Sequence, residues 1–179
     1  MSVLRISKKQ KEIIKYVGLG LLAVSAIAMP GIASLLKYFN PKNAKEKYSL
    51  NKSYKDLVNK NIIFLSGDKI KLSRKGIELY KKYQTQDIKI KKPKKWNGVW
   101  HLVCYDIPEK YKKKRDYFRY VLQDLGFYKI QNSLWVIPWE CKEEIAIVCQ
   151  NIGVQPFVIY MNTDRIPNEN KLKNKYNLK

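Results

Sequence analysis

A single carboxylate follows an apolar run in the middle of the chain, and two arginines come soon after it. Residues 99–105 are apolar and β-prone, Asp106 ends the run, and Arg115 and Arg119 lie four residues apart in the basic stretch that follows. A carboxylate at a strand end is a ligand that suits a hard cation such as Mg²⁺, which assists in-line attack at phosphate. The arginines, one helical turn apart, suit a phosphate contact, an ion pair between subunits or a solvated helix face.

Asp106 also has a structural interpretation. An aspartate just before a helix accepts the first free backbone N–H groups, and Pro108 suits a helix start because its missing donor costs little there. The only histidine, His101, lies inside the apolar run, and we expect a core residue with a hydrogen-bond partner rather than a catalytic base. Both interpretations of Asp106 stay open, and we favour the helix cap over the metal ligand.

The charge balance predicts a polyanionic partner. The 179 residues include 36 Lys and Arg against 15 Asp and Glu, a net charge of +21, which is far more than solubility requires. Nucleic acid is the first candidate partner, double-stranded DNA in particular, and an anionic membrane surface is the second. Cys104, Cys141 and Cys149 are odd in number, which favours reduced thiols in the cytoplasm over a disulfide framework. No Cys/His spacing suits zinc, and no cofactor is expected.

One uncharged segment, residues 16–36, is close to the roughly 20 residues that span a bilayer. It also contains several glycines and serines, and Pro30 would break or kink a membrane helix. We therefore expect two short buried helices of a soluble domain, and a membrane anchor is the alternative.

The first half of the chain has the element order of a winged helix. Residues 8–17 and 19–39 are predicted to be helical, residues 62–73 contain a hairpin, and Ser73 caps a helix that runs to residue 83. Between them, apolar residues at 50, 54, 57 and 58 define one face of a third helix. In a winged helix the third helix enters the major groove of DNA and the hairpin touches the backbone. The predicted DNA contacts are Asn51, Lys52, Lys55, Asn59, Lys69 and Lys71 in this half of the chain, and Arg115 and Arg119 in the second half.

The second half predicts a different domain. A basic linker, residues 86–96, precedes a strand at 99–105, a helix at 110–125, two strands around the polar break at 131–133, a helix that Gly153 ends, and a last strand. This order is the ferredoxin-like βαββαβ plan, assigned to residues 97–165. We expect the tryptophans to pack in this domain, and the basic tail at 166–179 to be extended or held by a partner. The chain is thus α+β, with residues 1–85 as the winged helix.

The second half also resembles a known family. Its motifs are Trp96-Asn97-Gly98-Val99-Trp100, Asp106-Ile107-Pro108, Arg115 with Arg119, Gly126-Phe127 and Gln131-Asn132-Ser133-Leu134-Trp135. In this order and spacing they resemble the central domain of PaaX-type transcriptional repressors, which is itself similar to the small CRISPR-associated endonuclease of the spacer-acquisition complex.

The resemblance implies two alternative functions. The repressor family places a winged helix before this domain, so the resemblance implies a cytoplasmic DNA-binding transcription regulator, not an enzyme, that forms a homodimer through the ferredoxin-like domain. In the nuclease, the carboxylate that ends the first strand binds a divalent metal and two subunits bring their copies together. The position of Asp106 therefore implies, as the alternative, a Mg²⁺-dependent endonuclease acting on DNA or RNA.

Overall fold

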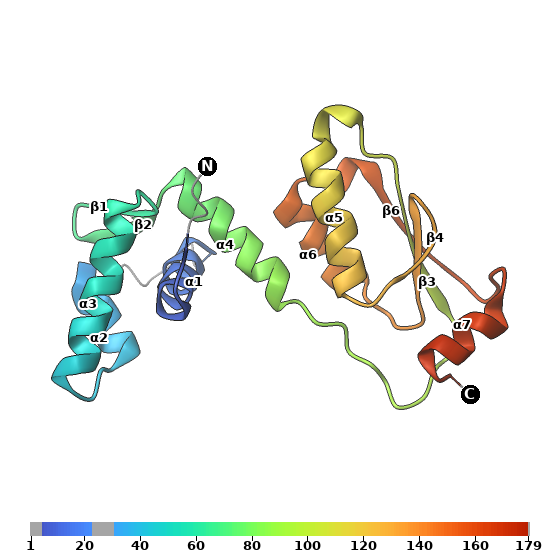
Figure 1. The fold of residues 1–179 in the computed structure, drawn as a ribbon, viewed down its shortest axis with the longest axis horizontal. Helices are drawn as coiled ribbons and strands as arrows, with labels where there is room; N and C mark the ends of the chain where they lie inside the picture. The colour runs from blue at the N-terminus through green and yellow to red at the C-terminus, as the bar shows by residue number, and fades with distance from the viewer. Residues whose placement is uncertain (1–4, 23–30, 179) are drawn as a thin grey trace. The chain divides into compact units, whose positions relative to one another are not determined.

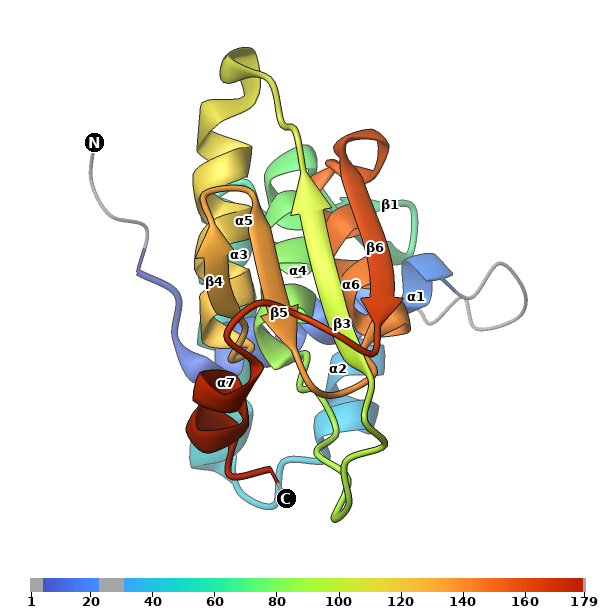
Figure 2. The same cartoon turned by 90° about the vertical axis from the view of Figure 1, so that its right-hand side faces the viewer.

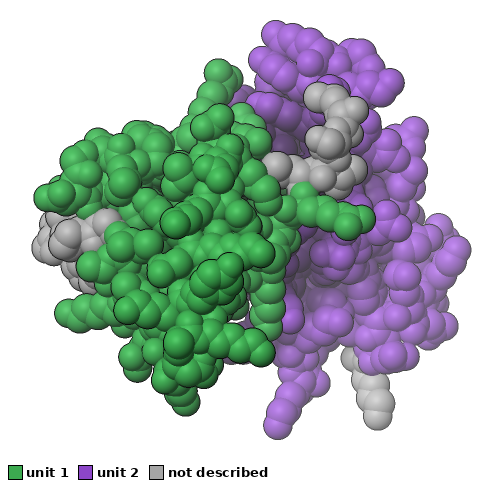
Figure 3. Space-filling model, turned by 60° about the vertical axis from the view of Figure 1, so that its left-hand side comes forward, with its two compact units in different colours: residues 1–84 green, residues 85–179 purple. Residues whose placement is uncertain are grey.

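The computed structural model describes residues 5–22 and 31–178 and divides into two compact units, residues 1–84 and 85–179 (Figures 1 and 3). The first unit is mainly helical and the second is built on a four-stranded sheet, so the α+β class expected from the sequence is confirmed. Each unit has its own buried apolar cluster.

Residues 5–22 and 31–84 of the first unit form four helices and one hairpin. Its elements are α1 (Lys8–Leu22), α2 (Gly31–Phe39), α3 (Ala44–Asn59), β1 (Ile63–Ser66), β2 (Lys69–Leu72) and α4 (Arg74–Asp87), whose last turn passes the division between the units. Ile13, Ile14, Leu35, Leu50 and Leu57 are among the fully buried residues of its core.

The described parts of the apolar stretch form helices, although α1 continues to Leu22 instead of ending at 17. Residues 23–30, which belong to the predicted helix at 19–39, lie outside the described residues, and α2 covers the rest of that prediction. Within residues 5–22 and 31–178, no helix is both long and apolar enough to cross a bilayer.

The hairpin leads directly into α4. β1 and β2 pair antiparallel with Ser66 opposite Lys69, and the Ser73 hydroxyl accepts the Gly76 N–H at 3.1 Å, so Ser73 caps α4 as predicted. A side chain at position 76 would overlap the carbonyl oxygen of Ile62, because the start of α4 lies against the backbone that enters β1. On α4, Tyr80 is buried, whereas Ile77 is 36% exposed.

The second unit has the predicted order of strands and helices. Its elements are β3 (Trp100–Tyr105), the 3₁₀ turn η1 (Glu109–Tyr111), α5 (Lys112–Asp124), β4 (Tyr128–Gln131), β5 (Leu134–Ile137), α6 (Lys142–Ile152), the 3₁₀ turn η2 (Gln155–Phe157), β6 (Val158–Thr163) and α7 (Glu169–Tyr176). All strand pairs are antiparallel and the sheet order is β4-β5-β3-β6. This is the ferredoxin-like arrangement.

Helices α5 and α6 cover one face of the sheet, and α7 lies against one end of the other face (Figure 2). Val103 pairs with Trp135 and Tyr160 in register, and all three side chains join the core beneath α5 and α6. On the opposite face, α7 covers Trp100 and Val136 with Leu172. The tryptophans pack as predicted: Trp100, Trp135 and Trp139 are buried, and Trp96 lies against Trp100.

The basic tail is not extended. α7 holds Leu172 only 2% exposed, and the Tyr176 hydroxyl donates to the Gly126 carbonyl at 2.8 Å. Glu169 accepts the Trp100 indole N–H at 3.0 Å and pairs with Lys173 at 3.1 Å. The amphipathic pattern of this short helix buries its apolar residues on the sheet, so the expectation of an extended tail was wrong.

The predicted linker at 86–96 also differs from the expectation. Ile88 and Ile90 pack on the core of the second unit, and the Lys92 ammonium lies 4.8 Å from the centre of the Trp139 ring. The Thr85 hydroxyl accepts a hydrogen bond from the Asn151 amide at 3.3 Å. The segment therefore packs on the second unit through Ile88 and Ile90, and its lysines are exposed.

A buried polar network confirms that His101 is a core residue. His101 is 4% exposed, and its Nδ1 lies 2.8 Å from the Tyr160 hydroxyl, which also accepts the Cys141 N–H at 3.2 Å. Burial lowers the pKa of His101, although the nearby Glu140 carboxylate opposes the shift. All three cysteines are free thiols, and burial raises the pKa of Cys141 and of Cys149 to about 12.

Candidate nucleic-acid interface and strand-end site

Helix α3 presents a basic stripe on its outer face. Asn43 caps the N-terminus of the helix, because its side chain accepts a hydrogen bond from the Glu46 N–H at 2.9 Å. The Glu46 carboxylate in turn accepts the Lys42 N–H at 2.8 Å. Leu50 and Leu57 are buried in the core on one face of the helix. The opposite face carries exposed residues at i, i+3, i+7, i+10 and i+14, which we call the α3 stripe: Lys45, Tyr48, Lys52, Lys55 and Asn59.

The predicted residues of α3 fall into two groups. Lys52, Lys55 and Asn59 are exposed, and neither lysine makes an ion pair within the described residues. Asn51 is only half-buried, but its amide oxygen is buried and has no hydrogen-bond partner in the described part of the chain. Asn51 therefore lies beside the stripe and does not present its acceptor to a ligand, contrary to the expectation of a base-edge contact.

The hairpin carries the other predicted lysines. Lys69 and Lys71 are exposed and alternate with the inward-facing Ile70 and Leu72, so they share one face of β2. Phe64, opposite Lys71 in the register, is 45% exposed beside them. α3 packs against β1 within the same unit (Figure 1), so the stripe and the hairpin lysines belong to one compact body.

The charge of the first unit is strongly unbalanced. Residues 1–84 contain 18 Lys and Arg against five Asp and Glu, a net charge of +13. Glu46 is engaged at the start of α3 and Glu78 pairs with Arg74 on α4 at 3.9 Å. A surface with this excess of cations attracts polyanions over long distances at low salt.

The second candidate site lies where β3 ends. The Asp106 N–H donates to the Phe157 carbonyl at 2.9 Å, which ties the strand end to η2. Its carboxylate is exposed and accepts no hydrogen bond within the described residues. The turn η1 begins after Pro108 and α5 after Tyr111, and no side chain caps either one. The prediction that Asp106 caps the following helix was therefore wrong, because the helix starts too far downstream.

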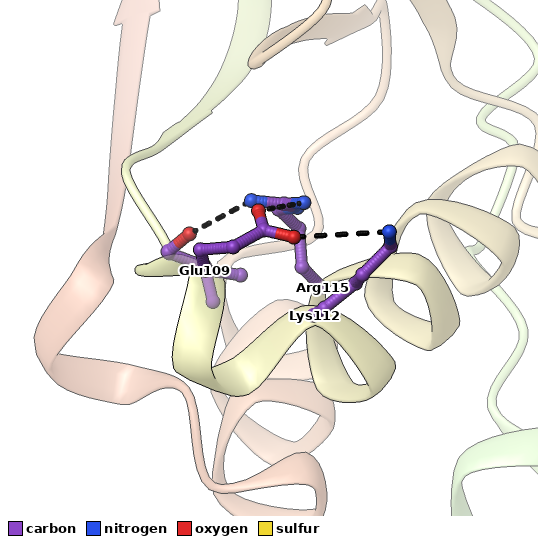
Figure 4. A network of polar contacts seen from close by, with 4 residues as sticks. Glu109, Lys112 and Arg115 are labelled. Atoms are coloured by element: carbon purple, nitrogen blue, oxygen red, sulfur yellow. Dashed lines mark hydrogen bonds and ion pairs between the residues drawn. The ribbon is translucent and has the colours of Figure 1, made fainter.

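A different carboxylate holds the β3–α5 connection. Glu109 accepts a hydrogen bond from Arg115 at 2.7 Å, and Lys112 lies 3.8 Å away, while Arg115 also donates to the Ile107 carbonyl at 3.4 Å (Figure 4). The bond from Arg115 lowers the pKa of Glu109, and that of Arg115 is raised in return. Arg115 is thus engaged within its own chain, and Arg119 has no ion pair among the described residues.

Asp106 faces a depression of about 780 Å³. Its polar lining comprises Asp106, Arg115, Arg119, Asn132 and Ser133. Mg²⁺ prefers several oxygen ligands, including one or two carboxylates. One carboxylate beside two guanidinium groups does not fit such a site within one chain, and no cluster of three His, Cys, Asp or Glu in the described residues suits a metal ion.

Together, a helical unit with a basic surface and a ferredoxin-like unit with the strand-end aspartate define a two-unit α+β protein of the kind that the motifs indicated. Residues 93–175 match the model of the PaaX protein central Cas2-like domain. The second unit is therefore similar to that domain. Comparison with curated proteins gives no match.

Sequence reasoning missed parts of both sites. Lys45 and Tyr48 continue the spacing of Lys52, Lys55 and Asn59, so the same periodicity could have identified them. The pairing of Glu109 with Arg115 had no such signal, because six residues separate them and a change from 3₁₀ to α-helix lies between.

Proposed function

We propose that the chain is a DNA-binding transcription regulator of the PaaX type, whose first unit is a winged helix that binds double-stranded DNA. The observation that carries the proposal is the α3 stripe: three lysines and an asparagine at heptad-like spacing, exposed on the third helix of a unit with a net charge of +13. A helix of this kind lies in the major groove and its cations hold phosphates.

The hairpin supplies a second set of phosphate contacts. Lys69 and Lys71 lie on one face of β2 and follow α3 directly in the fold, in the order in which a wing follows a recognition helix. Lysine grips phosphate as a point charge and reads bases poorly, so we expect modest sequence discrimination, with Asn59 as the residue best placed for a base edge.

The sheet unit is the proposed dimerisation module. On the sheet face that carries α7, Ile159 is 61% and Met161 41% exposed on β6, next to the half-buried Cys104. Exposed apolar neighbours of this kind favour a protein contact. Sedimentation velocity of the chain and of Ile159→Lys tests this part: the wild type should sediment as a dimer and the variant as a monomer. A monomeric wild type at micromolar concentrations would contradict it.

A matched pair of variants tests DNA binding. Fluorescence anisotropy of a labelled duplex is measured with the wild type and with Lys52, Lys55, Lys69 and Lys71 all changed to alanine. The control changes four exposed lysines scattered over the second unit, Lys94, Lys113, Lys142 and Lys171, and loses the same charge. We expect the first variant to lose at least tenfold more affinity than the control. Equal losses would show that net charge, not this surface, binds the DNA.

The endonuclease is the alternative proposal, and the exposed, unpartnered carboxylate of Asp106 favours it. It would require ligands beyond those of one chain, such as a second copy of Asp106. Incubation with DNA and with RNA in the presence of Mg²⁺ or Mn²⁺, beside Asp106→Asn, distinguishes the two. Metal-dependent cleavage that the substitution abolishes would replace the regulator as the primary function.

A further inference from the structure

The second unit has another groove, between α5 and the edge strand β4. Its α5 wall consists of Asp116, Arg119, Tyr120 and Gln123, at i, i+3, i+4 and i+7 on one helix face. Residues 126–129, Trp135 of β5 and Lys175 of α7 complete it. The groove encloses about 710 Å³, a size typical of sites for small ligands or single nucleotides.

The charges of this groove favour an anion. Three cations, Arg119, Lys129 and Lys175, line it against the single carboxylate of Asp116. Lys129 and Lys175 are exposed, and the Lys175 ammonium lies 5.5 Å from the centre of the Tyr128 ring. Arg119 makes no ion pair in the described part of the chain, so its guanidinium is available to a phosphate.

The groove also offers an aromatic platform. Tyr120 of α5 is 57% exposed. Its ring stacks on that of Tyr117, with centres 6.3 Å apart and planes inclined by 15°. Tyr117 thus supports the ring in a fixed orientation, and the exposed surface of Tyr120 is available to a planar ligand.

We propose that this groove binds a nucleotide of an unpaired nucleic-acid strand, with the base on Tyr120 and phosphates at Arg119 and Lys129. Aromatic rings beside cations are the combination that single strands require, because an unpaired base stacks on a ring while its phosphates meet the cations. A duplex does not supply this contact, since its bases are already stacked and paired. The proposal is independent of the duplex-binding function of the first unit.

An acidic peptide is the alternative ligand for this groove. β4 is an edge strand, and a peptide could add to it through backbone hydrogen bonds. The register of β4 with β5 is irregular between Lys129 and Gln131, which makes this edge a poor template for a further strand. The exposed Tyr120 ring is also better used by a base than by a carboxylate side chain.

The test uses the full chain and a labelled oligothymidine of about ten nucleotides, within the site sizes of single-strand binding modules. We expect Tyr120→Ala to weaken binding at least tenfold, Tyr120→Phe to stay within twofold because stacking is kept, and Arg119→Gln to weaken binding as well. A 5-bromouracil strand should crosslink to Tyr120. The variant without Lys52, Lys55, Lys69 and Lys71 should keep this crosslink, and unchanged tryptophan fluorescence should verify that each variant is folded.

Three results would overturn the proposal. The first is equal affinity for Tyr120→Ala and Tyr120→Phe. The second is displacement of the oligonucleotide by thymidine monophosphate at matching concentration, because a free nucleotide would then be the ligand. The third is displacement by oligoglutamate at a lower concentration than by unlabelled oligothymidine, which would assign the groove to an acidic peptide.

Discussion

The buried hydroxyl of Tyr160 makes a prediction about stability that the chain is well suited to test. Tyr160→Phe keeps the ring and removes two contacts, to His101 Nδ1 at 2.8 Å and from the Cys141 N–H at 3.2 Å. His101 Nε2 has no partner within the described residues, so the imidazole would lose its only polar contact there. Each buried group left unpaired costs about 1–3 kcal/mol. Because Tyr160 is half-buried, we expect a loss near the lower end of the sum, about 2–4 kcal/mol.

Tryptophan fluorescence isolates the unit concerned. All four tryptophans lie between residues 96 and 139, so urea unfolding followed by their emission reports the second unit, while far-ultraviolet circular dichroism reports both. Tyr160→Phe should move the fluorescence transition to lower urea, together with only that part of the circular dichroism change that comes from the second unit. A change below about 0.5 kcal/mol would show that the hydroxyl makes no net contribution and would refute the reasoning.

The same network predicts a pH dependence of the stability. Burial lowers the pKa of His101 in the folded chain, so the unfolded chain takes up this proton first as the pH falls. The free energy of unfolding of the second unit should therefore decrease between about pH 7 and pH 5. Since His101 is the only histidine, His101→Phe should flatten this slope. An unchanged slope in that variant would assign the pH dependence to other groups.

Three further substitutions probe the rest of the fold. Gly76→Ala places a methyl group against the Ile62 carbonyl oxygen and should destabilise the first unit by about 1–3 kcal/mol, seen in circular dichroism and not in tryptophan emission. Leu172→Ala should lower the stability of the second unit by about 2–5 kcal/mol in the same urea assay, because Leu172 is buried; no change would mean that α7 is not docked. Arg115 lowers the pKa of Glu109, so this pair stabilises the folded chain fully above the ordinary glutamate pKa. The stabilisation is lost as the pH falls through the lowered pKa of the folded state. Glu109→Gln should remove this pH-dependent contribution, measured by unfolding between about pH 6 and pH 3.

Much of the secondary structure could be predicted because its signals are local. Phe118, Val121 and Leu122 define one helix face by their spacing, and they are the buried residues of α5. Ser73 is both a good cap residue and the last residue before α4, so propensity and position agree. The order of strands and helices then restricted the second unit to few topologies.

The errors arose where tertiary contacts decide. α7 begins at Glu169, and the side chain of the preceding Asn168 makes no cap bond. The helix is held by contacts of Leu172 and Tyr176 with a distant sheet. Asp106 was assigned to a helix start that the 3₁₀ turn moves downstream. Asn51 was placed on the outer face by spacing alone, although its amide oxygen is buried.

The central claim, that the exposed lysines of α3 and the hairpin hold the phosphates of duplex DNA, is tested most directly by the salt dependence of binding. Each phosphate contact contributes about 0.9 to the slope of log K against log salt. The variant without Lys52, Lys55, Lys69 and Lys71 should therefore bind with a slope reduced by about 3.6, whereas the matched control should keep that of the wild type. An equal slope in the wild type and the four-lysine variant would contradict the account.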